Sequence, residues 1–262
     1  YSSHSQKPSA SPWMSQLSAG LVDFSTPALR DEAIELLVAA FNDEPSFRWV
    51  VGTEAGSEGQ YLRYVRWLAA LAVHVILAVR GLSLAVREDG EDGEDQMLGV
   101  ALLIPPETRL EDVGLAELTK TSGVGLPPFH RSFRSKKVSW GRAARRRERA
   151  LSTITRDTHR QLANMPHWYL WFLAVKPHVQ GRGVGTLLLD EIQKLQDRDV
   201  FPCYLETSRL QNVAIYTKKK FRVEKEFCVV AKESREDEIQ GFDVDLKMYA
   251  MLRPPMTTRA KL

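Results

Sequence analysis

Glycines at every second position follow the strongest predicted strand of the chain. The segment Trp168–Val175 is apolar throughout, and Gly181, Gly183 and Gly185 come soon after it. Glycine lets the backbone turn tightly and point successive N–H groups into one concavity. A helix that starts there adds unpaired N–H donors and the positive end of its dipole. The sequence therefore predicts a pyrophosphate cradle made by Gln180, Gly181, Arg182, Gly183, Val184, Gly185 and Thr186.

Two other phosphate-binding motifs fit this glycine segment poorly. A P-loop requires Gly-Lys-Ser/Thr, which does not occur here. A dinucleotide fingerprint spaces its glycines as Gly-x-Gly-x-x-Gly and lies early in a βαβ unit, whereas these glycines lie late in the chain. A plain strand-to-helix turn is the remaining alternative interpretation.

The glycine segment and the residues after it resemble the GNAT superfamily of N-acetyltransferases. Gln-x-x-Gly-x-Gly after a long apolar strand is similar to the CoA-binding signature of that superfamily. The run Tyr-Leu-Glu-Thr-Ser at 204–208, followed by Asn212, Tyr216 and Phe221, resembles its second signature. The stretch from His167 to Phe227, about a quarter of the chain, is similar to the puromycin N-acetyltransferase group and its fungal relatives.

The resemblance implies a fold and a cosubstrate. The expected fold is α/β, the GNAT (acyl-CoA N-acyltransferase) fold, with a mixed central sheet flanked by helices. Acetyl-CoA would be the acetyl donor and a small-molecule amine the acceptor, with direct attack in a ternary complex. Backbone groups of Leu173 and Val175 would pair with the pantetheine arm, in a strand that separates from its neighbour. Asn212 and Tyr216 would lie beside the glycine segment.

The resemblance also suggests residues for the two proton transfers. Tyr216 matches the position that protonates the departing thiolate, although packing alone is the alternative role. Glu206 is the first candidate for the general base that takes the proton of the amine, and His167 is the second. Glu206 as a hydrogen-bonded strand residue and His167 as a loop residue are the alternatives.

One residue departs from the family pattern. The family has glycine before the phenylalanine that follows the tyrosine helix, and here Lys220 stands before Phe221. A glycine in that place commonly ends a helix in a left-handed conformation. Lysine either adopts that conformation at a cost or the turn is built differently.

Periodicity and turn residues predict the remaining elements. The expected helices are Pro27–Phe41 after a Thr26 cap, Glu58–Ala78, Thr186–Arg198 and Asn212–Lys219. The acidic stretch Glu88–Asp95 is expected to be a hairpin loop between two strands. The expected strands are Leu21–Phe24, Leu82–Val86, Met97–Pro105, a central Trp168–Val175, Cys203–Thr207, Phe221–Ala231 and Val244–Leu252.

The chain is expected to be one domain over residues 21–253, with a disordered tail at 1–20 and a C-terminal tail at 254–262. Residues 107–167 read as a helical insertion that shapes the acceptor site, with a short helix at Leu110–Leu118 and a longer one at Arg142–Leu162. The arginines of the longer helix could contact nucleic acid, steer anionic CoA or form a solvated flank. The solvated flank is preferred, because no aromatic residues interleave for base stacking.

Composition limits the partners. The chain has 262 residues, a formal net charge of +3 and two cysteines, so no global charge favours nucleic acid and no disulfide framework is needed. The longest apolar run, Trp67–Val79, is shorter than the roughly 20 residues of a membrane span and is expected to be buried. The scattered histidines do not have zinc spacing, so no metal is expected. From the charge and the length of the apolar run, neither nucleic acid nor membrane is expected as a partner.

Two alternatives to a small-molecule enzyme remain, and they differ in class. The first is a protein or peptide N-acetyltransferase with an open groove, and the second is a catalytically silent acyl-CoA-binding domain. The expected location is the cytoplasm. The last residues, Ala260-Lys261-Leu262, resemble the peroxisomal address Ser-Lys-Leu, which makes the peroxisome a second expectation.

Overall fold

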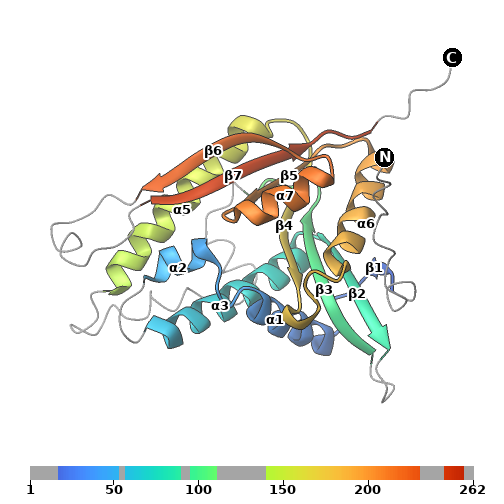
Figure 1. The fold of residues 1–262 in the computed structure, drawn as a ribbon, viewed down its shortest axis with the longest axis horizontal. Coiled ribbons are helices and arrows are strands. Elements are labelled where there is room, and N and C mark those ends of the chain that lie inside the picture. The colour runs from blue at the N-terminus through green and yellow to red at the C-terminus, as the bar shows by residue number, and fades with distance from the viewer. Residues whose placement is uncertain (1–16, 53–56, 90–94, 111–139, 231–244, 257–262) are drawn as a thin grey trace, which may run out of the picture.

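The computed structural model describes residues 17–52, 57–89, 95–110, 140–230 and 245–256. The helices are α1 (Pro27–Ala40), α2 (Pro45–Val51), α3 (Ser57–Ala78), α5 (Trp140–Leu162), α6 (Val184–Asp199) and α7 (Leu210–Lys218). The strands are β1 (Ala19–Leu21), β2 (Leu82–Asp89), β3 (Asp95–Ile104), β4 (Trp168–Val175), β5 (Cys203–Thr207), β6 (Arg222–Val230) and β7 (Asp245–Arg253). Figure 1 shows their arrangement.

The strands form one mixed seven-stranded sheet in the order β1-β2-β3-β4-β5-β7-β6. Neighbouring strands are antiparallel except β4 and β5, which are parallel and are connected through α6. The strand β4 occupies the centre, as its apolar sequence predicts, because a strand covered on both faces has little need for polar side chains.

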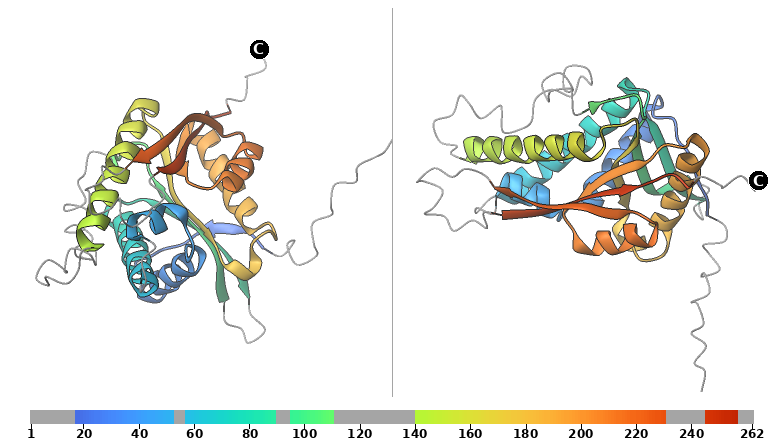
Figure 2. Two further views of the ribbon diagram at one scale, coloured as in Figure 1. Left: turned by 60° about the vertical axis from the view of Figure 1, so that its left-hand side comes forward. Right: turned by 90° about the horizontal axis from the view of Figure 1, so that it is seen from above.

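Helices cover both faces of the sheet, as Figures 1 and 2 show. On one face α1, α2, α3 and α5 pack on side chains such as Val100, Leu102 and Ala174. On the other face α6 and α7 pack on Leu170, Leu205 and their neighbours. We call these the α5 face and the α6 face of the sheet.

The helix α3 is the longest apolar helix of the described chain. Residues 58–78 are long and apolar enough to cross a membrane by length and composition alone. In the fold, however, side chains along the whole helix, among them Tyr61, Leu71 and Ile76, are buried against the rest of the core. The structure therefore gives α3 the place of a core helix, which is the interpretation drawn from the sequence.

Three expectations were wrong in detail. The first strand lies at Ala19–Leu21 rather than Leu21–Phe24, and Phe24 is instead a buried core residue. The first helix ends at Ala40 rather than Phe41, and a short helix that was not expected, α2, begins at Pro45. The basic face of α5 is not wholly solvated, because Arg147 is only 8% exposed.

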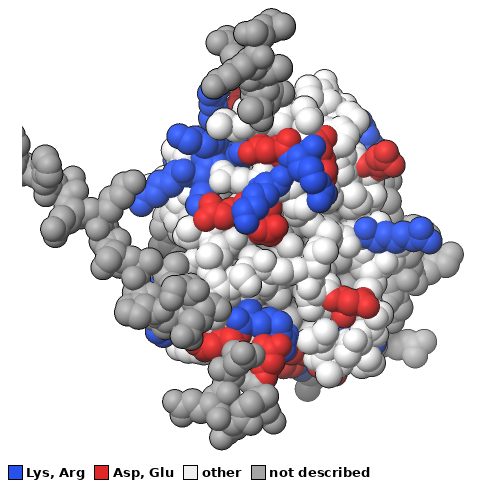
Figure 3. Space-filling model, turned by 90° about the vertical axis from the view of Figure 1, so that its right-hand side faces the viewer, with Lys and Arg blue, Asp and Glu red and all other residues white. Residues whose placement is uncertain are grey.

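Charges on the α6 side of the molecule are mixed. Figure 3 shows Lys and Arg side by side with Asp and Glu on the face that lies to the right in Figure 1. Two ion pairs within α6 are of this kind, Lys194–Glu191 and Arg198–Asp199. The net positive charge is therefore not gathered into one patch on this face.

Several expectations fall outside the described residues. They concern the terminal tails (1–16 and 257–262), most of the acidic hairpin loop and the insertion between 111 and 139.

Candidate active site

The parallel strands β4 and β5 separate soon after they meet. Their ladder contains two residue pairs, Trp168 with Cys203 and Tyr169 with Tyr204. The strand β4 remains paired with β3 as far as Val175. From residue 170 onward the edge of β4 that faces β5 is therefore left without a strand partner, and a gap opens in the sheet.

Backbone groups of β4 point into this gap. The N–H of Lys176 donates to the Leu98 oxygen of β3 at 2.9 Å. Because successive residues of a strand direct their backbone groups to opposite edges, Val175 and Leu173 face the gap. The Val175 oxygen accepts a hydrogen bond from Gln180 Nε2 at 3.1 Å. Leu173 and Val175 thus lie where an extended pantetheine arm could hydrogen-bond.

The glycine segment lies at the end of β4, between that strand and α6. Gly181 and Gly183 have φ values of 75° and 96°, in the left-handed region that favours glycine. The helix α6 begins at Val184, so the N–H groups of its first residues have no intrahelical acceptor. A Cβ on Gly185 would lie 3.6 Å from Val175 Cγ2, which shows how closely the first turn of α6 lies against β4.

These features fit a pyrophosphate. The turn with two left-handed glycines, the unpaired N–H groups of α6 and its dipole converge at the mouth of the gap. Gln180, Arg182 and Thr186 have exposed side chains around this turn, so an anion can reach it from solvent. The seven residues predicted to cradle the pyrophosphate therefore lie together in one short segment.

On the α5 face, Glu206 stands at the end of β5 beside the gap. Its Oε2 accepts a hydrogen bond from the Tyr169 hydroxyl at 2.8 Å, and its Oε1 accepts one from the Tyr204 hydroxyl at 3.0 Å. Tyr169 and Tyr204 form the last pair before the strands separate. The carboxylate is thus fixed at the point where the gap begins.

His167 is connected to the same cluster through His159 and Tyr204. Its Nδ1 donates to the Met165 oxygen at 2.6 Å, and its Nε2 lies 2.6 Å from Nε2 of His159. The His159 ring stacks on Tyr204, with 4.2 Å between centroids. Burial, with smaller contributions from His167 and Arg109, lowers the pKa of His159 to about 3, so His159 is neutral at pH 7. The structure therefore brings both base candidates together, with Glu206 nearer the gap.

On the α6 face, α7 carries the remaining predicted residues. Asn212 Nδ2 donates to Thr207 Oγ1 at 3.3 Å, which ties α7 to the end of β5. The half-buried Tyr216 ring packs edge-on against Phe221, with 5.7 Å between centroids. Burial raises the pKa of the Tyr216 phenol, and the charges of Cys203 and Glu44 raise it further. Tyr216 therefore keeps its proton at neutral pH.

Lys220 adopts the conformation that glycine has in the family pattern. Its φ is 69°, and the N–H groups of Lys220 and Phe221 donate to the oxygens of Thr217 and Tyr216. These two bonds are those of a Schellman motif with Lys220 at the left-handed position. The departure noted in the sequence thus leaves the turn after Tyr216 intact.

Sequence reasoning missed a carboxylate from the N-terminal part of the chain that contacts the residues following β5. Glu44 lies between α1 and α2, and its Oε1 accepts hydrogen bonds from Ser208 and Ser46. Its Oε2 accepts one from Arg209 Nε at 3.1 Å. The Asp-Glu-Pro sequence at 43–45 was the available signal, because acidic residues followed by proline are typical of the start of a helix.

The arrangement agrees with comparisons to known proteins. Residues 138–239 match the model of the Acetyltransferase (GNAT) family. The fold is also similar to that of solved acetyltransferase structures over more than nine tenths of this chain. The chain has the GNAT fold. None of the curated protein sequences matches it.

Three of the similar GNAT structures are informative. One is histone acetyltransferase HPA2 and related acetyltransferase from Corynebacterium glutamicum (22% identity, 93% of this chain and 99% of that one, TM-score 0.52). Another is mosquito arylalkylamine N-acetyltransferase like 5b (12% identity, 91% of this chain and 100% of that one, TM-score 0.52). The third is a Drosophila melanogaster polyamine N-acetyltransferase that forms N-acetylagmatine (13% identity, 91% of this chain and 100% of that one, TM-score 0.50). At these identities the likeness concerns the fold, and the nearness to the puromycin group stays a prediction.

Within the described residues, no group of three or more His, Cys, Asp or Glu side chains is arranged to hold a metal ion. The polar groups around the gap are instead carboxylates, phenols and backbone N–H groups.

Proposed function

We propose that this protein is an N-acetyltransferase that moves an acetyl group from acetyl-CoA to the amine of a small molecule. The observation that carries the proposal is the gap between β4 and β5. It has an anion cradle at its mouth, a phenol on the α6 face and a carboxylate on the α5 face.

The two faces of the gap suit two different ligands. The cradle formed by residues 180–186 and the free backbone edge of β4 suit the pyrophosphate and the extended arm of acetyl-CoA, which supplies a thioester. The α5 face, where Glu206 and Glu44 are held, suits an amine, because carboxylates attract ammonium groups and can accept their protons. Names of two similar structures, which refer to arylalkylamines and agmatine, support a small amine.

Proton transfers follow from the positions of Glu206 and Tyr216. The amine nitrogen forms a bond to the acetyl carbon, and the C–S bond breaks. Glu206 takes the proton that the nitrogen loses, and Tyr216 gives its proton to the sulfur. Tyr216 carries its proton at neutral pH, and because burial raises the pKa of its phenol, a hydrogen bond from the hydroxyl to the departing sulfur supplies much of the stabilisation before the proton moves. His167, whose two ring nitrogens are engaged, supports Glu206 through His159 and Tyr204.

The experiment is thiol release from acetyl-CoA in the presence of a panel of amines: tryptamine, agmatine, spermidine and a peptide with a free N-terminus. Turnover with one of the small amines is the expected result. Turnover with the peptide alone would favour a protein acetyltransferase. Acetyl-CoA binding without any turnover would indicate a silent acyl-CoA-binding domain.

Glu206→Gln is expected to lower kcat by about 10²-fold or more, because the amide keeps the shape of the side chain and cannot take a proton. Glu226→Gln is the matched control, since Glu226 is a half-exposed strand carboxylate paired with Lys247 on β7, away from the gap. If both variants keep normal kcat, Glu206 is not the base.

A further inference from the structure

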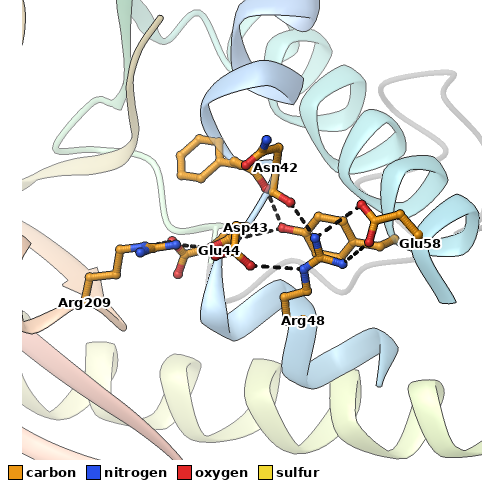
Figure 4. Close-up of polar contacts among 8 residues, drawn as sticks. Asn42, Asp43, Glu44, Arg48, Glu58 and Arg209 are labelled. Carbon is orange, nitrogen blue, oxygen red and sulfur yellow. Dashed lines mark hydrogen bonds and ion pairs between the residues drawn. The ribbon is translucent and has the colours of Figure 1, made fainter. Parts of the chain in front are cut away.

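Arg209 connects two segments that are remote in sequence, at the end of the gap. It occupies the position between β5 and α7, directly before the helix that carries Asn212 and Tyr216. Its side chain crosses to the α1–α2 connection, where Nε donates to Glu44 Oε2 at 3.1 Å and Nη2 donates to the Asp43 oxygen. Figure 4 shows this bridge.

Glu44 is held in one orientation by these contacts. Its side chain is 12% exposed, and Ser208 and Ser46 bond to the oxygen that Arg209 does not take. Ser208 directly follows β5, two residues after Glu206, so its bond to Glu44 ties that carboxylate to the end of the strand that carries Glu206. Glu44 is also close enough to Tyr216 for its charge to act on that phenol. Both carboxylates and Tyr216 are therefore gathered around one end of the gap.

The same connection is anchored on its other side by Arg48. That guanidinium pairs with Glu58 at 2.6 Å and with Asp43 at 3.3 Å, donates to the Asn42 oxygen at 2.9 Å and lies 3.6 Å from the centroid of the Tyr61 ring. Arg48 thus fixes the backbone of the α1–α2 connection to α3, as Figure 4 also shows. The backbone N–H of Arg48 donates to the Glu44 backbone oxygen at 2.9 Å, whereas the Glu44 carboxylate itself is contacted by Arg209 and the two serines.

We propose that Arg209 is a positioning residue for acetyl transfer, which holds the Glu44 carboxylate at the α5 face of the gap so that Glu44 receives the acceptor amine. The proposal rests on the proposed function. Arg209 acts through Glu44, and it also keeps the α1–α2 connection in register with α7. The half of the site that binds the acceptor and the half that carries Tyr216 are in this way joined by one side chain.

Arg48 is a close match to Arg209 as a control. Their side chains are 26% and 30% exposed, each contacts a glutamate, and each donates to a backbone oxygen of residues 42–43. If Arg209 only anchored the loop, the two arginines would be equivalent in their effect on the reaction.

The kinetic test compares Arg209→Met with Arg48→Met, with agmatine and tryptamine as probe amines. Arg209→Met is expected to lower kcat/KM for the amine about tenfold and to leave the KM for acetyl-CoA within about twofold. The kcat/KM of Arg209→Lys for the amine is expected to lie between those of the unmodified protein and Arg209→Met, because one ammonium cannot reproduce the forked contact with Glu44 and the Asp43 oxygen. Arg48→Met is expected to lose thermal stability and keep kcat/KM within about twofold. Equal kinetic losses in the two methionine variants would overturn the proposal.

A double-mutant cycle decides whether Arg209 acts through Glu44. In the Glu44→Gln background, Arg209→Met is expected to add less than about a threefold loss in kcat/KM for the amine, because its partner charge is already gone. A full tenfold loss in that background would mean that Arg209 works by another route, and the proposal would be wrong.

Hydrogen exchange separates this inference from the proposed function, because it needs no turnover. In the free protein, Arg209→Met is expected to speed amide exchange in peptides from both 42–51 and 209–218, and Arg48→Met in 42–51 alone. If no amine is acetylated but exchange rises in both segments, the bridge holds and the proposed function fails. If exchange in 209–218 does not change, the bridge itself is refuted.

Discussion

At the scale of single residues, the structure gives the two proton-carrying groups opposite surroundings. Glu206 accepts hydrogen bonds from two tyrosine hydroxyls, which fix the orientation of its carboxylate. Tyr216 lies among apolar side chains with a carboxylate nearby, which stabilises its neutral form. The two groups therefore lie in polar and apolar surroundings, respectively, on opposite faces of the same gap.

Tyr216→Phe tests the acid role. Removing the hydroxyl is expected to lower kcat about 10²-fold, because a thiolate of pKa near 8.5 then leaves without its proton donor. The affinity for acetyl-CoA, measured by calorimetry, should be almost unchanged, since the ring still packs on Phe221. A near-normal kcat would assign Tyr216 to packing and leave water or Tyr204 to protonate the sulfur.

Local signals and family resemblance named candidate residues on each side of the gap, but not how they combine. Glycine spacing indicated residues 180–186, and the resemblance to the family's second signature indicated Tyr216. Glu44 was missed because its partner Ser208 is 164 residues away, and no periodicity reports a contact across that separation. The contact of Tyr169 with Glu206 was likewise not predicted, because cross-strand pairing is set by the sheet and not by local sequence.

At the scale of elements, the long helices and strands were predicted correctly and the shortest ones were not. Long helices and the apolar strands showed clear periodicity and appear where expected, with ends shifted by a few residues. The helix α2 has seven residues and β1 has three, too few for a period to emerge. The separation of β4 from β5 is implied by resemblance to the family, and nothing in either strand taken alone predicts it.

Three helices end on left-handed residues that are not glycine. Arg80 follows α3, Val200 follows α6 and Lys220 follows α7, with φ values of 53°, 59° and 69°. Left-handed backbone costs an L-residue about 1–2 kcal/mol, most for a β-branched one such as Val200. These turns are therefore places where the fold carries strain that glycine would relieve.

Lys220→Gly is expected to stabilise the protein by about 0.5–1 kcal/mol, the relief of strain less the greater freedom of glycine in the unfolded chain. Ala214→Gly is the control inside α7, and should destabilise by about 1 kcal/mol. Urea unfolding of both variants gives the comparison. Lower stability for Lys220→Gly would show that the lysine side chain contributes more than its backbone costs.

At the scale of the whole molecule, the described chain ends at Met256, three residues after the last strand of the sheet. The strand β7 ends at Arg253, and the last residues lie outside the described chain. We propose that Ala260-Lys261-Leu262 directs the protein to peroxisomes, since a receptor reads such a tripeptide at the end of a chain.

A fluorescent protein fused to the N-terminus tests the address, because the fusion leaves the C-terminal tripeptide free. Punctate fluorescence in a fungal cell is expected, together with diffuse fluorescence once Leu262 is removed. Diffuse fluorescence from both forms would assign the protein to the cytoplasm.

The gap between β4 and β5 also makes the sheet a structure that the protein alone leaves incomplete. An acetyl-CoA arm that pairs with β4 would take the place of a neighbouring strand. The free energy of unfolding would then increase with the concentration of acetyl-CoA. At a concentration 100 times the Kd, ligand that binds only the folded state adds about 2.7 kcal/mol. The melting temperature should rise with acetyl-CoA concentration and stay flat in Gly183→Val, whose side chain strains the left-handed turn. In a cell with little acetyl-CoA, most of the protein would then be in the ligand-free form, which has the lowest melting temperature.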